Sequence, residues 1–451
     1  MEPFRHHVFV CTQQKPEGVT CCPASGSMSI LGALHGELGK QKLSDEVQVT
    51  NCGCLGLCDD GPIMIVYPEG TWYRKVTPAD VPEIVTSHLK TGYVVSRLQW
   101  NDPPAMKAAA VDHTQKYLDM VKAKDEAGIL PDDLNDLARA FMSSRALLTA
   151  LELDIFTAVA DGASADAVAQ KIGASPRSTE MLLNALVGLK LLEKRDGDFF
   201  TTAITGRFFA EGSPDNACGG LLHTANLWHR WSTLTDAVRT GTSIAPRVRN
   251  NGWAQTFIAA MDRNAKERAG VVVKAIAPNG IKRVLDLGGG SGAYSIALAR
   301  AVRGLKAEIV DTPEVVPLTQ DYIREAGLSD RISTRVGDML TDPLGDGYDL
   351  VLVMAICHMF SPDENRTLFE RAFNALAPKG RIVVQDFILE PDKTAPRAAA
   401  LFALNMLVGT TAGSTYSEPE YANWLRDAGF TGVHCVRLPG PAGLMIGFRA
   451  G

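Results

Sequence analysis

The sequence predicts a multidomain α/β protein, and three observations lead to that prediction. At 451 residues the chain is too long for one ordinary core, because domains average roughly 150 residues. Six of the nine cysteines lie within the first 58 residues, which sets the N-terminal part apart. Beyond residue 280, β-branched strands alternate with helical stretches. That alternation is typical of βαβ units and a largely parallel sheet.

The composition and charge narrow the classes of function. A content of 46% hydrophobic and 21% charged residues is ordinary for a folded protein. The net charge of -6 leaves no global basic field to attract nucleic acid or anionic lipid. The N-terminus lacks an apolar signal region, and no segment approaches about 18 uninterrupted apolar residues. We therefore expect a soluble, cytoplasmic protein that binds neither nucleic acid nor membrane.

Residues 1–98 are predicted to form a first domain that mixes strands with two helices. Strands are expected at 7–10, 47–49, 63–67 and 72–76, and helices at 27–39 and from 78 to about 90. Thr77 is the expected N-cap of the second helix, with Pro78 at its first position. Residues 99–135 begin with Asn-Asp-Pro-Pro and continue as a charged stretch, which indicates a linker that includes an exposed helix.

Residues 136–240 are predicted to be mainly helical. Two helices at 165–171 and 176–190 are followed by a hairpin over 191–201 that turns at Asp-Gly. This order is that of a winged helix, so a DNA-binding regulator has to be considered. The candidate recognition helix offers only Arg177 as a cation, however, and its apolar surface suits dimerisation better.

Residues 241–451 contain a glycine-rich loop between a strand and a helix. The strand 283–287 leads into Gly288-Gly289-Gly290-Ser291-Gly292, where glycine permits a sharp turn and close approach of the backbone to a ligand. Taken alone, the loop also fits the fingerprint of a dinucleotide-binding site, and it could instead be a tight turn that binds no ligand. The acids that follow favour another cofactor. Asp311 can bind ribose hydroxyls, and Asp338 can bind an adenine amino group while Met339 lies against the base.

These strand-end acids, with Asp286 at the loop, resemble the class I S-adenosylmethionine-dependent methyltransferases. Residues 136–450 further resemble the small-molecule O-methyltransferases of the hydroxyindole and caffeic acid type. The matching stretches are 284–292, 311–316, 337–340, 356–358 and 380–384. The resemblance implies a winged-helix-like dimerisation domain over 136–240 that forms a homodimer, and a Rossmann-like catalytic domain over 241–451. It also implies that S-adenosylmethionine is bound by Asp286, Gly288, Gly290, Asp311, Asp338 and Met339.

His358 follows the apolar strand predicted at 349–355 and is the candidate general base. A neutral imidazole can take a phenolic proton while the oxygen attacks the sulfonium methyl group. In the family, a carboxylate one strand later orients this histidine, and Asp386 matches it. Two departures are Met359, where an acid is common, and Thr415, where a second orienting acid is expected. An ordinary strand-end histidine is the alternative.

The acceptor is expected to be a small, flat, apolar molecule that presents a hydroxyl group. Aromatic residues in the stretches that face the acceptor in the family are Trp228, Trp231, Phe257, Phe360 and Phe387. Core packing explains any one of them equally well. A thiol, nitrogen or carbon acceptor is also compatible with the motifs.

The N-terminal cysteines predict an iron–sulfur site. Cys11 and Cys22, and Cys54 and Cys58, place four thiolates on two loops, which can hold a 2Fe-2S cluster. With the stretches 22–27 and 54–62, residues 5–92 resemble the thioredoxin-like 2Fe-2S ferredoxins, which implies that these four cysteines are the ligands. Zinc in the same thiolates and a cluster-free domain are alternatives, and Cys21 and Cys52 are extra. A redox partner for the cluster is compatible with this interpretation.

Three hypotheses of function follow. The first is an S-adenosylmethionine-dependent O-methyltransferase with a ferredoxin domain, and the second is a redox-sensing winged-helix regulator. The third joins them, so that the oxidation state of the cluster gates methyl transfer. The intact donor motifs and His358 favour the first hypothesis.

Overall fold

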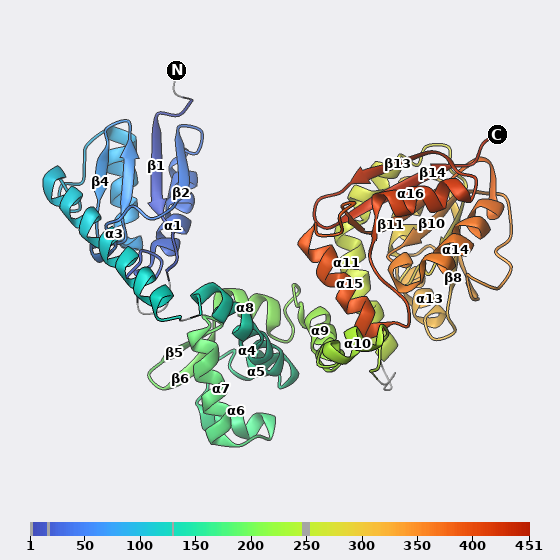
Figure 1. Cartoon of the computed structure of the whole chain (residues 1–451), viewed down its shortest axis with the longest axis horizontal. Helices are drawn as coiled ribbons and strands as arrows, with labels where there is room; N and C mark the ends of the chain where they lie inside the picture. The colour runs from blue at the N-terminus through green and yellow to red at the C-terminus, as the bar shows by residue number, and fades with distance from the viewer. Residues whose placement is uncertain (1–2, 16–18, 129, 246–252) are drawn as a thin grey trace. The chain divides into compact units, whose positions relative to one another are not determined.

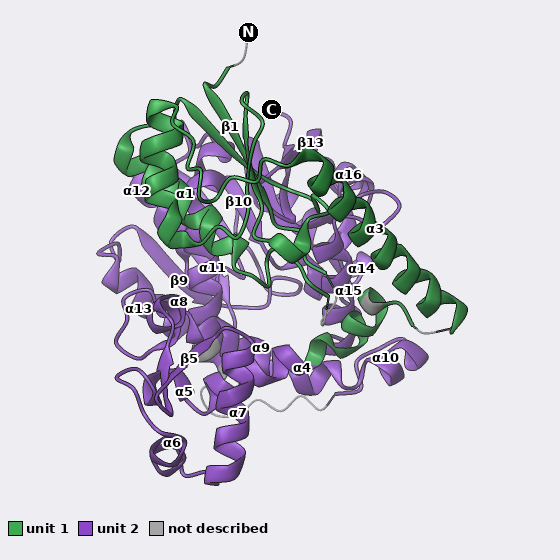
Figure 2. Cartoon of the chain, turned by 90° about the vertical axis from the view of Figure 1, so that its left-hand side faces the viewer, with its two compact units in different colours: residues 1–141 green, residues 142–451 purple. Residues whose placement is uncertain are grey.

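The computed structural model describes residues 3–15, 19–128, 130–245 and 253–451. The chain divides into two compact units, residues 1–141 and 142–451 (Figures 1 and 2). Within the described ranges, no helix is long and apolar enough to cross a membrane.

A four-stranded sheet forms the centre of the first unit. Its order is β2 (Val47–Cys52), β1 (His6–Cys11), β3 (Met64–Tyr67) and β4 (Thr71–Tyr73). Strands β1 and β2 are parallel, whereas β3 is antiparallel to both β1 and β4. Helix α1 (Ser27–Gln41) buries its apolar face, formed by Ile30, Leu34 and Leu38. The predicted mixture of strands and helices is confirmed.

The second predicted helix of this unit begins as expected but is irregular. The backbone N–H of Thr77 donates to Asp80 Oδ2 (2.7 Å), so the predicted N-cap is part of a capping box. Three short pieces follow, η2 (Pro78–Asp80), α2 (Val81–Glu83) and η3 (Ile84–Leu89), the last with π-helical geometry. The expected linker contains α3 (Pro103–Glu126), which is capped by Asp102 and has no fully buried residue.

The second unit begins with a helical region and a hairpin. Its elements are α4 (Asp132–Glu152), α5 (Ile155–Ala158), α6 (Ala165–Ile172), α7 (Pro176–Gly188), β5 (Leu192–Arg195), β6 (Asp198–Thr201) and α8 (Ala203–Phe209). The hairpin turns at Asp196 and Gly197, whose φ angles of 50° and 93° are both left-handed. Asp-Gly is the pair that such a turn favours. The predicted order of two helices and a hairpin is therefore confirmed.

A larger sheet dominates the rest of this unit. Its order is β13 (Thr431–Arg437), β14 (Ala442–Phe448), β11 (Leu376–Leu389), β10 (Tyr348–Met354), β7 (Arg283–Leu287), β8 (Lys306–Asp311) and β9 (Ile332–Val336), with β12 (Tyr416–Ser417) beside β11. The strands from β11 to β9 are parallel, as the sequence predicts, and β14 is antiparallel to both β11 and β13.

Helices cover both faces of this sheet (Figure 1). One face packs against α14 (Pro362–Ala375) and α16 (Glu418–Asp427), and the other against α11 (Trp253–Ile276), α12 (Ala293–Ala301) and α13 (Val316–Glu325). Helices α9 (Cys218–Trp231), α10 (Leu234–Thr240) and α15 (Arg397–Gly409) complete the unit. The strand order reverses between β7 and β10. In open α/β sheets such a switch point marks the ligand crevice, at the carboxyl ends of the strands.

Candidate functional sites

The glycine-rich loop joins β7 to α12 at the switch point of the large sheet. Gly288 has a left-handed φ of 67°, and a Cβ atom there would come within 2.6 Å of the Ile356 side chain. The methyl group of Met339 lies 3.1 Å from the same position. Three segments that follow different strands therefore meet at Gly288, where only glycine fits.

Asp311 ties the loop to the neighbouring strand. Its Oδ2 accepts a hydrogen bond from the backbone N–H of Gly290 (2.9 Å), and its Oδ1 accepts one from Thr312 (2.7 Å). Burial at the end of β8 raises the pKa of this carboxyl. Two residues predicted to bind the cofactor, Gly290 and Asp311, are thus in direct contact.

Asp338 and Met339 follow β9, where the sequence places them. Asp338 is exposed, and its Oδ1 accepts a hydrogen bond from the N–H of Leu340 (2.8 Å). Met339 is half-buried against Gly288. Together these two side chains can bind a purine, because the Asp338 carboxylate can accept a hydrogen bond from its edge while Met339 packs on its face.

Asp286 lies beneath the loop rather than at an open edge of the crevice. Its side chain is fully buried, and its Oδ2 accepts a hydrogen bond from Ser295 Oγ (2.6 Å). Its Oδ1 has no hydrogen-bond partner among the described residues. Burial raises the pKa of Asp286 to about 7. A Cβ atom on Gly289 would lie 2.9 Å from this carboxylate, so the geometry favours support of the loop over direct contact with a ligand.

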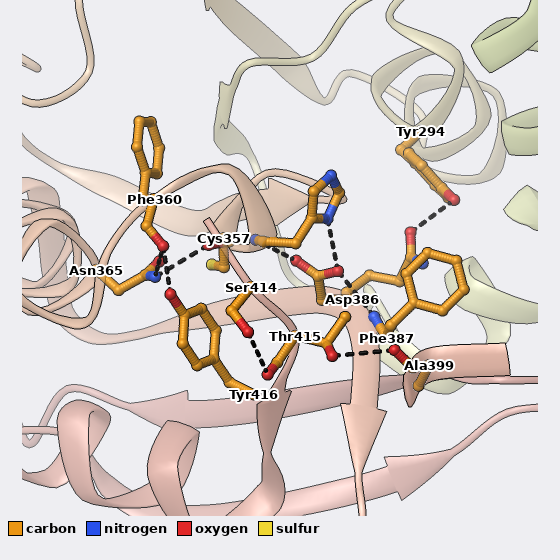
Figure 3. Close-up of polar contacts among 12 residues, drawn as sticks. Tyr294, Cys357, Phe360, Asn365, Asp386, Phe387, Ala399, Ser414, Thr415 and Tyr416 are labelled. Atoms are coloured by element: carbon orange, nitrogen blue, oxygen red, sulfur yellow. Dashed lines mark hydrogen bonds and ion pairs between the residues drawn. The ribbon is translucent and has the colours of Figure 1, made fainter. Parts of the chain in front are cut away.

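His358 and Asp386 form a buried pair. His358 lies in the turn η4 (Cys357–Met359) after β10, and its Nδ1 donates to Asp386 Oδ1 (2.8 Å). The Asp386 carboxylate also accepts the N–H groups of His358 (3.1 Å) and Phe387 (2.8 Å), so three donors fix it in place (Figure 3). Because a carboxylate only accepts, the proton belongs on Nδ1 of the neutral ring. Nε2 is then free to accept a proton.

Aromatic rings surround this pair. Phe402 of α15 meets His358 edge to face (5.0 Å between centroids) and stacks with Phe387 (4.2 Å). Trp231 Nε1 donates to Asn405 Oδ1 (3.0 Å), which joins α9 to α15. Phe402 was not predicted as a site residue, because helix 397–409 is apolar on nearly every side and its pattern does not single out one residue.

A second unpredicted residue, Gly413, lies against the His358 turn. A Cβ atom there would overlap the carbonyl oxygen of His358, so the segment before β12 can approach this closely only with glycine. Thr415, at the position where the family has a second orienting acid, donates its hydroxyl to the carbonyl of Ala399 (3.0 Å; Figure 3). Its hydroxyl is therefore used to anchor α15.

The four predicted cysteines come together in the first unit as two pairs. The sulfur atoms of Cys54 and Cys58 are 3.4 Å apart. Cys11 and Cys22 form the other pair, and a hydrogen bond with Cys22 lowers the pKa of the Cys11 thiol to about 6. A Cβ atom on Gly61 would lie 2.9 Å from Cys22 Sγ, so a side chain at this position would collide with the sulfur atom. Soft thiolates on two adjacent loops fit an iron–sulfur cluster. Lys15 and His113, which the sequence did not single out, also reach this site.

Comparisons with known proteins agree with this fold. The model of the O-methyltransferase domain matches residues 231–431, and that of the O-methyltransferase dimerisation domain matches 135–212. The model of the thioredoxin-like [2Fe-2S] ferredoxin matches residues 2–88. The fold and the matched models therefore define a class I methyltransferase joined to a ferredoxin domain.

The relatives narrow this class. The 3-hydroxy-5-methyl-1-naphthoate 3-O-methyltransferase of Streptomyces sahachiroi is 34% identical over 71% of this chain and 96% of its own length. The acetylserotonin O-methyltransferase of Bos taurus is 30% identical over 68% and 94%. The structure of human N-acetylserotonin methyltransferase with S-adenosylmethionine matches 70% of this chain and 97% of its own, with 28% identity and a TM-score of 0.63.

The chain belongs to the S-adenosylmethionine-dependent O-methyltransferases. It is an enzyme of this family, with S-adenosylmethionine and a 2Fe-2S cluster as its cofactors.

Proposed function

We propose that this enzyme methylates a hydroxyl group of a small, flat aromatic acceptor, with His358 as the general base. The observation that supports this proposal is the hydrogen bond between His358 Nδ1 and Asp386, which leaves Nε2 as the free acceptor. S-adenosylmethionine supplies an electrophilic methyl group. His358 takes the proton of the acceptor hydroxyl, and the Asp386 carboxylate stabilises the imidazolium that forms.

Two observations support an aromatic acceptor. The rings that contact His358 are Phe387 and Phe402, which offer flat apolar surfaces. Helix α15, which carries Phe402, is also bonded to Trp231 through Asn405. The names of two relatives specify a hydroxynaphthoate and acetylserotonin as acceptors. Both molecules are fused aromatic rings.

For the methyl donor, we propose that Gly288, Gly290, Asp311, Asp338 and Met339 bind S-adenosylmethionine, with Asp286 supporting the loop from behind. The strand-end positions of the acids and the crowding at Gly288 support this assignment. Binding at this switch point would place the donor between β7 and β10, on the side where His358 follows β10.

For the first unit, we propose that Cys11, Cys22, Cys54 and Cys58 would hold the 2Fe-2S cluster. The adjacent sulfur atoms of Cys54 and Cys58, and the contact between Cys11 and Cys22, support this ligand set. The cluster supplies one-electron redox chemistry, which methyl transfer itself does not need. We therefore propose a separate redox partner for it. The match to a dimerisation domain supports a homodimer.

A turnover assay with isotopically labelled S-adenosylmethionine and phenolic, thiol and amine acceptors tests the assignment of His358. His358→Ala should lower kcat for a phenolic acceptor by about 10²- to 10⁴-fold, the range of general-base catalysis. Asp386→Asn should lower it less, because the ring is retained but loses its charged partner.

The control for this assay is His434→Ala, which changes an exposed histidine on β13. It should leave turnover unchanged. Full methylation of a phenol by the His358→Ala protein would refute the general base. Methylation of a thiol alone, independent of His358, would move the proposal to the alternative acceptor class.

A further inference from the structure

Helix α3 lies outside the segments that match the ferredoxin and dimerisation models, which end at residue 88 and begin at residue 135. One stripe of its surface is half-buried, while its other faces are exposed. The stripe includes Met106, Ala110, His113 and Tyr117, at the three- and four-residue spacing of one helix face. A helix with one covered stripe has a partner along that stripe.

The partner of this stripe is the pair of cysteine loops. A Cβ atom on Gly56, between Cys54 and Cys58, would lie 3.2 Å from Ala110 Cβ. Met106 and Ala110 also pack on the apolar cluster that contains Cys11 and Cys22. The helix therefore covers the site where the four cysteines meet.

Lys15 lies between this helix and the pair formed by Cys54 and Cys58. Its ammonium donates to Cys58 Sγ (3.3 Å) and to His113 Nε2, and it lies 5.2 Å from the centre of the Tyr117 ring. The His113 nitrogen and the sulfur atoms of Cys54 and Cys58 all lie within 4.8 Å of one another. A positive charge with two partners on α3 thus touches a cysteine sulfur.

We propose that α3 is a built-in lid of the iron–sulfur site, and that it holds Lys15 against Cys58 to raise the reduction potential of the cluster. Reduction adds one electron to the cluster, and a cation beside a ligand sulfur stabilises the more negative state. Hydrogen bonds to ligand sulfurs act in the same direction. The four cysteines would supply all four protein ligands of a 2Fe-2S cluster, so His113 is a positioning residue that acts through Lys15.

The inference rests on the proposed cysteine ligands, so the iron and sulfide content of the full-length holoprotein is measured first. A wild-type protein without a cluster would refute the ligand set, and not the lid. The test is a dithionite titration of the cluster, monitored by electron paramagnetic resonance, for the wild type and for Lys15→Met, His113→Leu and Lys122→Met. Lys122→Met removes the same charge from an exposed position on α3.

At a fixed potential, Lys15→Met should lower the ratio of reduced to oxidised cluster at least threefold relative to Lys122→Met. His113→Leu should shift it in the same direction by less. A Lys15→Met potential equal to that of Lys122→Met would overturn the proposal. A His113→Leu potential equal to that of the wild type would overturn the role of α3. If Lys15→Met assembles no cluster, the His113→Leu titration alone decides by the same criterion.

Discussion

Asp286 and Asp386 are the same residue type on two strands of one sheet, β7 and β11, yet their surroundings differ. Asp386 accepts three hydrogen bonds, which fix its position beside His358. Asp286 is fully buried and accepts one hydrogen bond, from Ser295. The first carboxylate is suited to orient the histidine, whereas burial favours the neutral form of the second.

The raised pKa of Asp286 predicts a pH dependence of stability. Its pKa rises from the ordinary 3.8 to about 7 in the folded protein, so the folded state binds this proton more tightly than the unfolded state. Stability contributed by the group is therefore present below about pH 4 and is lost as the pH rises through 7. The loss amounts to at most about 4 kcal/mol, at 1.36 kcal/mol per pKa unit.

Asp286→Asn keeps an acceptor for Ser295 and removes the titration. Urea unfolding of the ligand-free protein between pH 5 and 8 should show that the variant gains stability relative to the wild type as the pH rises. Asp330→Asn, at an exposed turn, serves as the control. Parallel pH profiles for wild type and Asp286→Asn would contradict the prediction.

At this scale the sequence predicted the residues that belong to motifs and missed those that depend on tertiary contact. His358 follows β10 and Asp386 lies within β11, so both could be found by their position relative to apolar runs, and the structure brings them together. Phe402, Gly413 and Lys15 carry no local signal. Their importance comes from α15, from the segment before β12 and from α3, which approach the sites from distant parts of the chain.

Among the elements, the loop between β7 and α12 shows most directly how backbone shape makes a binding site. Gly288→Ala introduces both a strained φ and a clash with Ile356. We expect it to weaken binding of S-adenosylmethionine at least tenfold, or by about 1.4 kcal/mol, as measured by isothermal titration calorimetry. The reason is that the added methyl group would displace the side chains of Ile356 and Met339, which lie beside the loop where we propose that S-adenosylmethionine binds.

Gly304→Ala provides a matched control for that substitution. Gly304 also has a left-handed φ (79°), but a Cβ atom there would meet no heavy atom within 4 Å. Both variants therefore carry the strain of a left-handed alanine, and only Gly288→Ala carries the clash. Equal affinities in the two variants would show that packing at Gly288 does not shape the site.

The helices and strands were predictable where their period is regular, and less so where the backbone departs from it. The parallel strands and the Asp-Gly hairpin lie where apolar runs and turn residues place them. The strand predicted to reach residue 76 ends at Tyr73, because Lys75 adopts a left-handed φ of 50°. The helix after Thr77 takes π-helical geometry, which no sequence period announces.

For the whole molecule, the assembly of two chains is the property that the fold predicts most directly. Helix α4 enters the matched dimerisation domain with exposed apolar side chains, among them Leu134 (50% exposed), Leu137 (66%) and Met142 (55%). Apolar groups left open in this way favour a second copy of the chain. Sedimentation should give twice the 48.5 kDa mass of one chain.

Substitution of this surface should separate the two copies. Leu137→Asp would place a charge in the proposed interface and yield monomers, whereas Val238→Asp would change an equally open apolar residue on α10 as a control (61% exposed). A wild type that sediments as one chain would contradict the homodimer.

The domain boundaries predicted at residues 98, 135 and 240 stay predictions. The division into two compact units falls at residue 141 and tests none of them.

Two of the six tryptophans, Trp72 and Trp100, pack against the same apolar cluster as Cys11 and Cys22. A 2Fe-2S cluster bound at these cysteines would absorb light in the region where indole emits, so we expect it to quench the fluorescence of these two side chains. The protein thus contains its own optical reporter. Loss of iron, for example on exposure to air, becomes visible as a rise in emission from the first unit, without any added dye.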